Sequence, residues 1–393
     1  MPVQQRVRDF SLSAVVAGFV AVLVGFTSSV VIVFAAAQAL GATPAQATSW
    51  IWALGIGMGV TTIGLSWWYR EPVLTAWSTP GAALIAGTSG VAMGEAVGAF
   101  MACGGLIVLA GATRLFERVM DRIPQAIAAA LLAGVLARFG LDAAGAVKTA
   151  PLLVIAMALI FLAGRRWWPR YAVPGVLLAG LAVAAGEGRM QWSRLAWEAA
   201  VPVWTTPVFS GSAFVGIALP LFVVTMASQN LPGVAAQRAA GYRTPVSAPV
   251  TTTGIATVLL APFGGYTFNL AAITAAICMG REAHEDPARR YTASIAAGMF
   301  YIVIGLVGGA VIGLLQAFPR ELVLAVAGLA MLGTISGGLA AALKDERHRD
   351  AAGLTFLVTL SGVSLGGVGS AFWGVVAGAF ALLVQQWRPG GSR

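Results

Sequence analysis

The feature that most constrains the fold is a series of long apolar stretches separated by short charged breaks. Of the 393 residues, 58% are hydrophobic and only 10% are charged, and the mean hydropathy is +0.84. A water-soluble chain carries about a quarter of its residues as Asp, Glu, Lys and Arg, so most of this surface must meet lipid. The composition excludes an ordinary soluble protein and predicts an all-α polytopic membrane protein.

Fourteen segments approach or exceed the roughly 20 apolar residues that a membrane-spanning helix needs. They lie near residues 12–38, 45–68, 72–88, 93–116, 123–138, 149–165, 171–186, 211–230, 246–262, 264–280, 289–317, 320–343, 351–367 and 369–387. The third and tenth, at about 17 residues each, are barely long enough to span as continuous helices. The first is too long for the apolar core of a cleavable signal peptide and is expected to remain as a span.

Lys and Arg residues indicate the orientation, because short cytoplasmic loops are enriched in them. With the N-terminus inside, 19 of the 24 basic residues fall on the cytoplasmic side. The five expected on the outer side are Arg138, Lys148, Arg189, Arg194 and Arg320. This split predicts a bacterial inner-membrane protein with both termini in the cytoplasm. The net charge of +9 follows from topology and not from a basic face, so a nucleic-acid partner is excluded.

Segments one to seven and eight to fourteen share the same order of features. The first and eighth spans each become polar toward their ends, at residues 27–29 and 228–230, and the third and tenth are each interrupted by Pro and Gly. Because seven is odd, the two halves must be inverted relative to each other. Inverted repeats with corresponding broken segments point to a transporter whose binding site lies near the bilayer midplane.

The third segment is predicted to be extended before it becomes helical. Residues 73–77 include β-favouring side chains, and Pro80 cannot donate the hydrogen bond that a continuous helix needs there. Ser78 or Thr79 can serve as the N-cap, with Pro80 in the first turn and Gly81 continuing a half-helix.

The tenth segment is predicted to break in the same way. Pro262, Gly264 and Gly265 interrupt it, residues 266–268 are strand-like, and Asn269 is expected to cap a half-helix from residue 270 to residue 279. The alternative is that both segments are kinked but continuous spans, because Pro and Gly are common in membrane helices. A true break requires that protein buries the non-helical backbone or that it lines a cavity.

Four motifs in these regions resemble the benzoate/proton symporter (BenE) family. They read Thr75-Ala-Trp-Ser-Thr-Pro-Gly-Ala-Ala-Leu84, Ser228-Gln-Asn-Leu-Pro-Gly233, Ala261-Pro-Phe-Gly-Gly-Tyr-Thr-Phe-Asn-Leu270 and Glu282-Ala-His-Glu-Asp-Pro-Ala-Arg-Arg-Tyr291. The resemblance covers essentially the whole chain. More distantly, the pattern is similar to the nucleobase/ascorbate transporter fold. That fold implies a core domain of residues 1–118 and 210–318, a gate domain of residues 119–209 and 319–393, and often a homodimer.

The resemblance implies a carrier that imports an aromatic carboxylate such as benzoate with protons by alternating access. Nucleobase carriers typically hold the base with carboxylates in the eighth and tenth spans, where this chain has Met226 or a neighbour and Phe268. A site without fixed negative charge suits an anion, so we expect the substrate carboxylate at the facing N-termini of the two half-helices. The candidate binding residues are Ser28, Trp77, Ser78, Thr79, Gly81, Gln229, Asn230, Tyr266, Thr267, Phe268 and Asn269.

No cofactor or metal is implied, and an enzyme is not expected. Glu95, at the outer end of the fourth span, is the candidate proton carrier, although a solvated carboxylate at a helix start is the alternative. The acidic loop at residues 282–286 also holds His284, but neighbouring arginines favour an ion-pair cluster over a metal site. Cys103 and Cys278 are expected to be packing residues.

Two other functions remain open from the sequence. A nucleobase or other organic-anion symporter would have the same fold. An anion channel is less favoured because it would be expected to show rings of like residues or a repeated filter motif.

The topology is testable by labelling. In a background lacking Cys103 and Cys278, single cysteines in place of Gly188 and Ala288 are expected to react with a membrane-impermeant thiol reagent from opposite sides. Labelling of both positions from the same side would contradict the fourteen-span topology.

Overall fold

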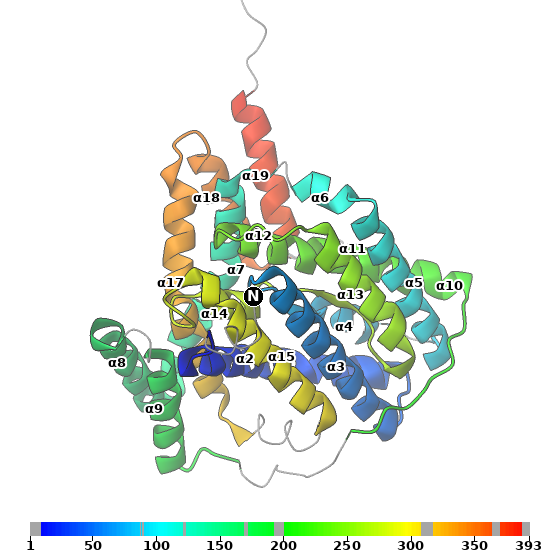
Figure 1. Cartoon of the computed structure of the whole chain (residues 1–393), viewed down its shortest axis with the longest axis horizontal. Helices are drawn as coiled ribbons and strands as arrows, with labels where there is room; N and C mark the ends of the chain where they lie inside the picture. Colours follow the sequence, from blue (N-terminus) through cyan, green and yellow to red (C-terminus); the bar gives the residue numbers. More distant parts are fainter. Residues whose placement is uncertain are drawn as a thin grey trace, which may run out of the picture.

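A computed structural model of the chain describes residues 9–86, 88, 90–120, 123–168, 172–191, 200–307, 317–363 and 370–386, and these are mainly helical (Figure 1). The helices are α2 (Leu12–Ala39), α3 (Pro44–Tyr69), α4 (Thr79–Ala86), α5 (Met93–Ala112), α6 (Leu115–Met120), α7 (Gln125–Gly145), α8 (Pro151–Trp167), α9 (Ala172–Gly186), α10 (Gly211–Ala213), α11 (Leu219–Thr225), α12 (Leu231–Ala239), α13 (Ser247–Leu260), α14 (Ile273–Met279), α15 (Tyr291–Leu306), α17 (Arg320–Lys344), α18 (Arg349–Ser361) and α19 (Ser370–Gln386). Two short strands, β1 (Thr75–Trp77) and β2 (Phe268–Leu270), complete the fold.

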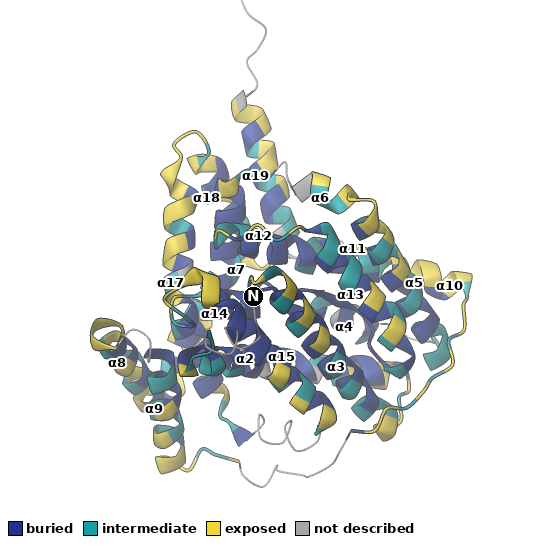
Figure 2. Ribbon diagram, viewed as in Figure 1, coloured by how far each residue is buried: buried dark blue, intermediate teal, exposed yellow. Residues whose placement is uncertain are grey.

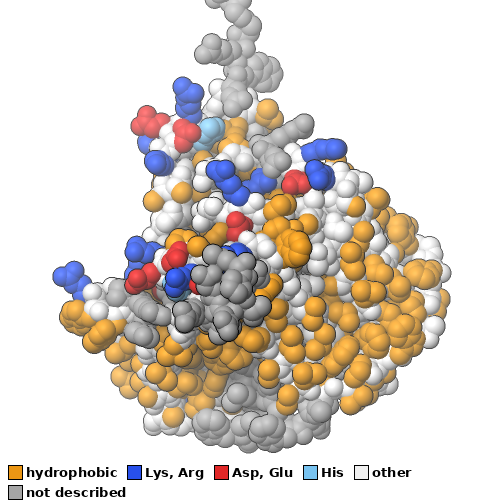
Figure 3. All heavy atoms as spheres, viewed as in Figure 1, with side chains coloured by type: hydrophobic (Ala, Val, Ile, Leu, Met, Phe, Trp, Pro, Cys, Tyr) orange, Lys and Arg blue, Asp and Glu red, His pale blue; other side chains and the backbone are white. Residues whose placement is uncertain are grey.

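Several of these helices can cross a membrane. Within the described residues, five helical stretches are long and apolar enough to do so: α3, α5, α7 continued to Lys148, the run Gly211–Ala239, and α17. Shorter apolar helices accompany them. Figure 3 shows charged side chains gathered toward the top of one face, while apolar side chains cover most of the rest. The chain is therefore a multi-pass membrane protein, and the count of fourteen spans and the inverted repeat stay predictions.

Glycines allow the central helices to pack backbone against backbone. A Cβ atom on Gly55 of α3 would lie 2.6 Å from the Cα of Gly305 in α15, and one on Gly59 would lie 2.7 Å from a carbonyl oxygen of the same helix. Small residues at helix interfaces let backbones approach in this way in membrane proteins.

Two groups of helices can be followed in Figure 1. Helices α2 and α3 pack on α15, and α5 packs on α13, whereas α7 packs on α17 and α18, and α18 packs on α19. Figure 2 shows buried residues concentrated in the middle of the molecule and exposed ones along α8 and α17. Helix α7 also packs on α12, which joins the two groups, and the division into core and gate domains stays a prediction.

The third and tenth segments are broken, so continuous kinked helices were the wrong alternative. Strands β1 and β2 pair in antiparallel fashion, with Thr75 opposite Leu270 and Trp77 opposite Phe268. The Ser78 hydroxyl oxygen accepts a hydrogen bond from the Gly81 N–H at 3.1 Å, which confirms Ser78 as the cap of α4.

The prediction for the second break was wrong in its details. The strand occupies residues 268–270 instead of 266–268, and α14 begins at Ile273 without a side-chain cap. Asn269 therefore lies within β2 and caps no helix. The physical reason is that the backbone here pairs with β1 beyond the expected strand end, since the Ala271 N–H donates to the Leu74 carbonyl at 2.9 Å.

The long helical run from Gly211 to Ala239 contains two π-helical turns, Phe214–Ala218 and Met226–Asn230. Each turn is followed two residues later by a proline, Pro220 or Pro232. Proline cannot donate to the carbonyl four residues earlier, and its ring crowds that carbonyl, so the helix widens locally. Single π turns of this kind occur frequently at functional sites.

Gly264 gives a test of the second break. Its φ is +100°, and a Cβ there would lie 1.9 Å from the Trp50 ring, whereas Gly241 has φ +88° with open space around it. We expect Gly264→Ala to lower the free energy of unfolding in mixed micelles by about 1–3 kcal/mol more than Gly241→Ala, because it adds overpacking to backbone strain. Equal losses in the two variants would show that the contact with Trp50 contributes nothing.

Candidate functional site

A cavity of about 310 Å³ lies beside the two chain breaks, at the lower end of the range of roughly 300–1,000 Å³ typical of small-molecule sites. Its walls come from α2, α3, β1, the start of α4, α7, the second π turn and the start of α12, residues 271–274, α15, α18 and the start of α19. Elements of both predicted domains therefore enclose it.

Three of the predicted binding residues line this cavity: Trp77, Thr79 and Gln229. Trp77 is fixed in place, because its indole N–H donates to the Ser29 Oγ at 3.0 Å and its ring packs edge-on against Phe26. Ser29 lines the cavity and was not among the predicted residues. Its neighbour Ser28, which was, lies in α2, but its side chain is outside what the structure describes.

Ser78, Gly81 and Tyr266 lie behind the cavity wall. Ser78 and Tyr266 are fully buried, and the Tyr266 hydroxyl donates to the Ser78 carbonyl oxygen at 3.0 Å. The Tyr266 ring packs against both Trp50 and Phe100, with centroid distances of 5.7 and 6.2 Å. These residues hold the start of α4 in position, and they are not among the residues that line the cavity.

Thr267 and Phe268 are also buried away from the cavity lining. The Phe268 ring lies against α3, where a Cβ on Gly57 would be 2.3 Å from its Cζ atom, and its N–H donates to the Thr257 Oγ1 at 3.0 Å. The Thr267 hydroxyl lies 3.4 Å from that of Thr225. The structure therefore does not bring Phe268 to the cavity as an apolar wall.

Asn269 is fully buried, and neither atom of its side-chain amide has a hydrogen-bond partner among the described residues. It is directly opposite Ala76 in the β1–β2 pair. Asn269 is not among the residues that line the cavity. The hydrogen-bonding capacity of its amide is therefore unused within the described residues.

The second π turn gives adjacent residues different roles. Ser228 and Gln229 line the cavity, whereas Asn230 is buried on the other side. The Asn230 Oδ1 accepts a hydrogen bond from the Leu270 N–H at 2.9 Å, and its Nδ2 donates to the Met226 sulfur at 3.2 Å. Asn230 is thus a support for β2, while its neighbours face the cavity.

The predicted end of the fifth span at residue 138 was wrong. Helix α7 continues to Gly145, so Arg138 lies within an apolar helix, and its location toward the outer side of the membrane stays a prediction. Arg138 lines the cavity and is the only charged residue among those recorded in its lining. Residues 139–145 contain no proline, and this was the available clue that the helix continues past Gly140.

Glu95 lies in the first turn of α5, where its carboxylate accepts a hydrogen bond from the Ala92 N–H at 3.4 Å. It does not line the cavity. This is the geometry of the alternative that the sequence left open, a helix-start carboxylate. Its role as proton carrier stays a prediction.

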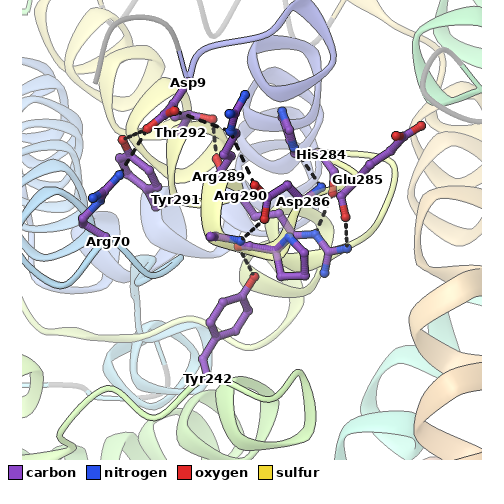
Figure 4. A network of polar contacts seen from close by, with 12 residues as sticks. Asp9, Arg70, Tyr242, His284, Glu285, Asp286, Arg289, Arg290, Tyr291 and Thr292 are labelled. Carbon is purple, nitrogen blue, oxygen red and sulfur yellow. Dashed lines mark hydrogen bonds and ion pairs between the residues drawn. The ribbon is translucent and has the colours of Figure 1, made fainter. Parts of the chain in front are cut away.

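A polar network lies around the loop between α14 and α15 (Figure 4). Arg289 pairs with Asp286 at 3.4 Å and with Asp9 at 3.5 Å, which confirms the predicted ion-pair cluster. Buried Arg290 donates to the Met279 carbonyl at 2.8 Å and so holds the C-terminal end of α14.

Tyr242 joins this network, and its hydroxyl donates to the Pro287 carbonyl at 3.0 Å. Burial raises the pKa of the Tyr242 phenol. The hydroxyl therefore stays protonated and acts as a donor across the neutral pH range.

Known proteins similar to this chain were found at both sequence and structure level. A family model described as benzoate membrane transport protein (BenE) matches residues 8–384. The inner membrane protein YdcO of Escherichia coli (strain K12) is 48% identical over 380 residues, covering 96% of this chain and 97% of that protein. A benzoate membrane transport protein of Acinetobacter baylyi is 40% identical over 378 residues, covering 96% of each.

Among solved structures, that of SLC26A9 is similar with a TM-score of 0.52 at 12% identity, covering 96% of this chain and 66% of that chain. At this level of identity the likeness concerns the fold alone.

The different roles of Gln229 and Asn230 can be separated by mutation. Asn230→Ala leaves the buried Leu270 N–H without its partner and should lower the free energy of unfolding by about 1–3 kcal/mol. Gln229→Ala, on the cavity side of the same turn, should change it by no more than about 0.5 kcal/mol. Unfolding in mixed micelles measures both, and an Asn230→Ala protein as stable as wild type would remove Asn230 as the support of β2.

Proposed function

We propose a function from one premise: the chain belongs to the BenE family of benzoate membrane transport proteins, whose model matches nearly all of it. It is thus a membrane transport protein and not an enzyme. Its relative in Escherichia coli is named as an inner membrane protein, and the apolar helices support a multi-pass location in that membrane. The substrate in our proposal is an aromatic carboxylate of the benzoate type.

The observation that carries this proposal is the chemistry of the cavity. Among the described residues, no acidic side chain lines the cavity. Ser29, Thr79 and Gln229, which carry hydroxyl or amide groups, do line it. Apolar side chains such as Val135 and Phe139 make up most of the remaining surface. A few polar groups in a mostly apolar concave site are typical of small-molecule binding, and the absence of carboxylates favours an anion over a nucleobase.

The substrate carboxylate in this proposal lies at the starts of the two half-helices. Thr79 and Pro80 open α4 on one side of the cavity, and residues 272–274 lead into α14 on another. The aligned peptide dipoles give the start of a helix about half a positive charge. At α4 this dipole is the main contribution, because Pro80 has no N–H and the Gly81 N–H donates to the Ser78 hydroxyl. In this proposal the buried amide of Asn269 in β2, which has no hydrogen-bond partner among the described residues, is a further donor within this region.

Transport in this proposal occurs by alternating access with protons imported alongside the substrate. The cavity lies where α2, β1 and α4 meet α7 and α18, so relative movement of the two predicted domains would open it to either side. Glu95 is the candidate carrier from the sequence, and protonation of the substrate itself or of a loop acid during gating is the alternative. A homodimer is part of the same proposal.

Uptake measurements test the proposal. Proteoliposomes containing the purified protein are expected to accumulate labelled benzoate, faster with an inward proton gradient than without one, and unlabelled benzoate should compete where uracil does not. Protein-free liposomes are the control for passive entry of benzoic acid. Uptake no faster than in those liposomes, or competition by uracil alone, would overturn the proposed substrate.

A further inference from the structure

We propose that Arg138 of α7 is the cation that binds the substrate carboxylate, and that the site selects monocarboxylates for this reason. The inference rests on the proposed function and specifies how the site recognises charge. It differs from a site made of helix starts alone, because the charge comes from a side chain of α7, which is neither of the two half-helices.

The position of Arg138 is the first argument. It lies 13 residues after the start of α7 at Gln125 and seven before its end at Gly145, which places it about 20 Å and 10 Å from the two ends. This helix is apolar and long enough to span the membrane. Ionisable residues inside membrane spans are rare and costly, and they mark substrate or ion pathways unless a partner neutralises them.

The second argument is that the described residues supply no such partner. No carboxylate of the described residues forms an ion pair with Arg138, and no acidic residue is recorded in the lining of the cavity. Among the described residues, the cavity lining thus has one formal positive charge and no negative one to balance it. A bound carboxylate would supply the missing charge.

The surroundings of Arg138 stabilise its positive charge. Its guanidinium lies over Gly362, where a Cβ atom would come within 2.0 Å of Nη1. Gly362 is the C-cap of α18 and has φ +69°, so the guanidinium lies beside a helix C-terminus. The partial negative charge of that terminus favours a cation and stabilises the charged guanidinium of Arg138. Unlike a carboxylate partner, it leaves the guanidinium able to pair with a bound anion.

The chemistry of the guanidinium sets the ligand class. Its planar fork matches the two oxygens of a carboxylate, and such charge-assisted pairs are stronger than neutral hydrogen bonds. Thr79 and Gln229 on the facing walls can donate to the same group, and the apolar lining accommodates the ring. One cation balances one carboxylate, so an aromatic dicarboxylate would bring an uncompensated negative charge into the site.

The experiment compares a charged ligand with its neutral isostere on paired variants. Affinities for benzoate, benzamide and phthalate are measured on purified wild type, Arg138→Gln and Arg138→Lys. Arg320→Gln is the control, since it removes the same charge from the start of α17, outside the recorded lining of the cavity. We expect wild type to bind benzoate at least about tenfold more tightly than benzamide or phthalate.

In Arg138→Gln the affinity for benzoate should fall at least about tenfold, while the affinity for benzamide should change by less than about twofold. Arg138→Lys should be intermediate, because it keeps the charge and loses the fork. Arg320→Gln should behave as wild type. An unchanged ratio of benzoate to benzamide affinity in folded Arg138→Gln overturns the inference, whereas wild type that binds no benzoate overturns the proposed function instead.

A measurement on the wild-type protein keeps the inference testable if Arg138→Gln does not fold. Phenylglyoxal modifies accessible arginines, and mass spectrometry of the peptide that contains Arg138 reports the extent. Benzoate should protect Arg138 from modification and benzamide should not. Equal modification of Arg138 with and without saturating benzoate overturns the inference.

Discussion

The structure depends on how the backbone is hydrogen-bonded where two helices are interrupted inside the protein. In a membrane protein each unpaired backbone group costs several kcal/mol away from water, so the breaks need partners of their own. Strands β1 and β2 pair with each other. Side chains from flanking helices complete the set: the Thr75 N–H donates to Thr62 of α3, and the Phe268 N–H donates to Thr257 of α13. Buried hydroxyls thus do what water does for a loop in a soluble protein.

This pairing also determines where the candidate site lies. Because β1 leads directly into α4 and β2 is followed closely by α14, the strand pair fixes the starts of both short helices beside one cavity. Asn230 and Tyr266 reinforce this arrangement through hydrogen bonds to Leu270 and Ser78. Helices α7 and α18 then close the cavity from the side that carries Arg138. The polar part of the site is consequently rigid on one wall and charged on the other.

The sequence predicted the breaks well because their causes are local. Pro80 and the Pro262–Gly265 region disrupt helix wherever they occur, and Ser78 caps the next turn through its own hydroxyl. Asn269 was misplaced because its state depends on β1, which is nearly 200 residues away in the sequence. Arg138 was assigned to a loop because a charged residue usually ends a membrane span, and its tolerance within α7 depends on the distant Gly362. Phe268 was expected at the cavity from a family comparison, but strand register turned it toward Gly57.

The π turn at Met226–Asn230 makes this part of the chain unusually sensitive to its length. A π turn holds one more residue than an α-helical turn would, and here the extra residue lets Gln229 face the cavity while Asn230 supports β2. A single-residue deletion within 226–230 would let the helix close in the regular way. The helical segments before and after the turn would keep their relative rotation, because a single π turn absorbs its extra residue locally. The turn itself would have one residue fewer to divide between cavity lining and strand support. Substitutions can therefore accumulate in this turn more readily than insertions or deletions, and relatives that share the site are expected to keep its residue count even where its side chains differ.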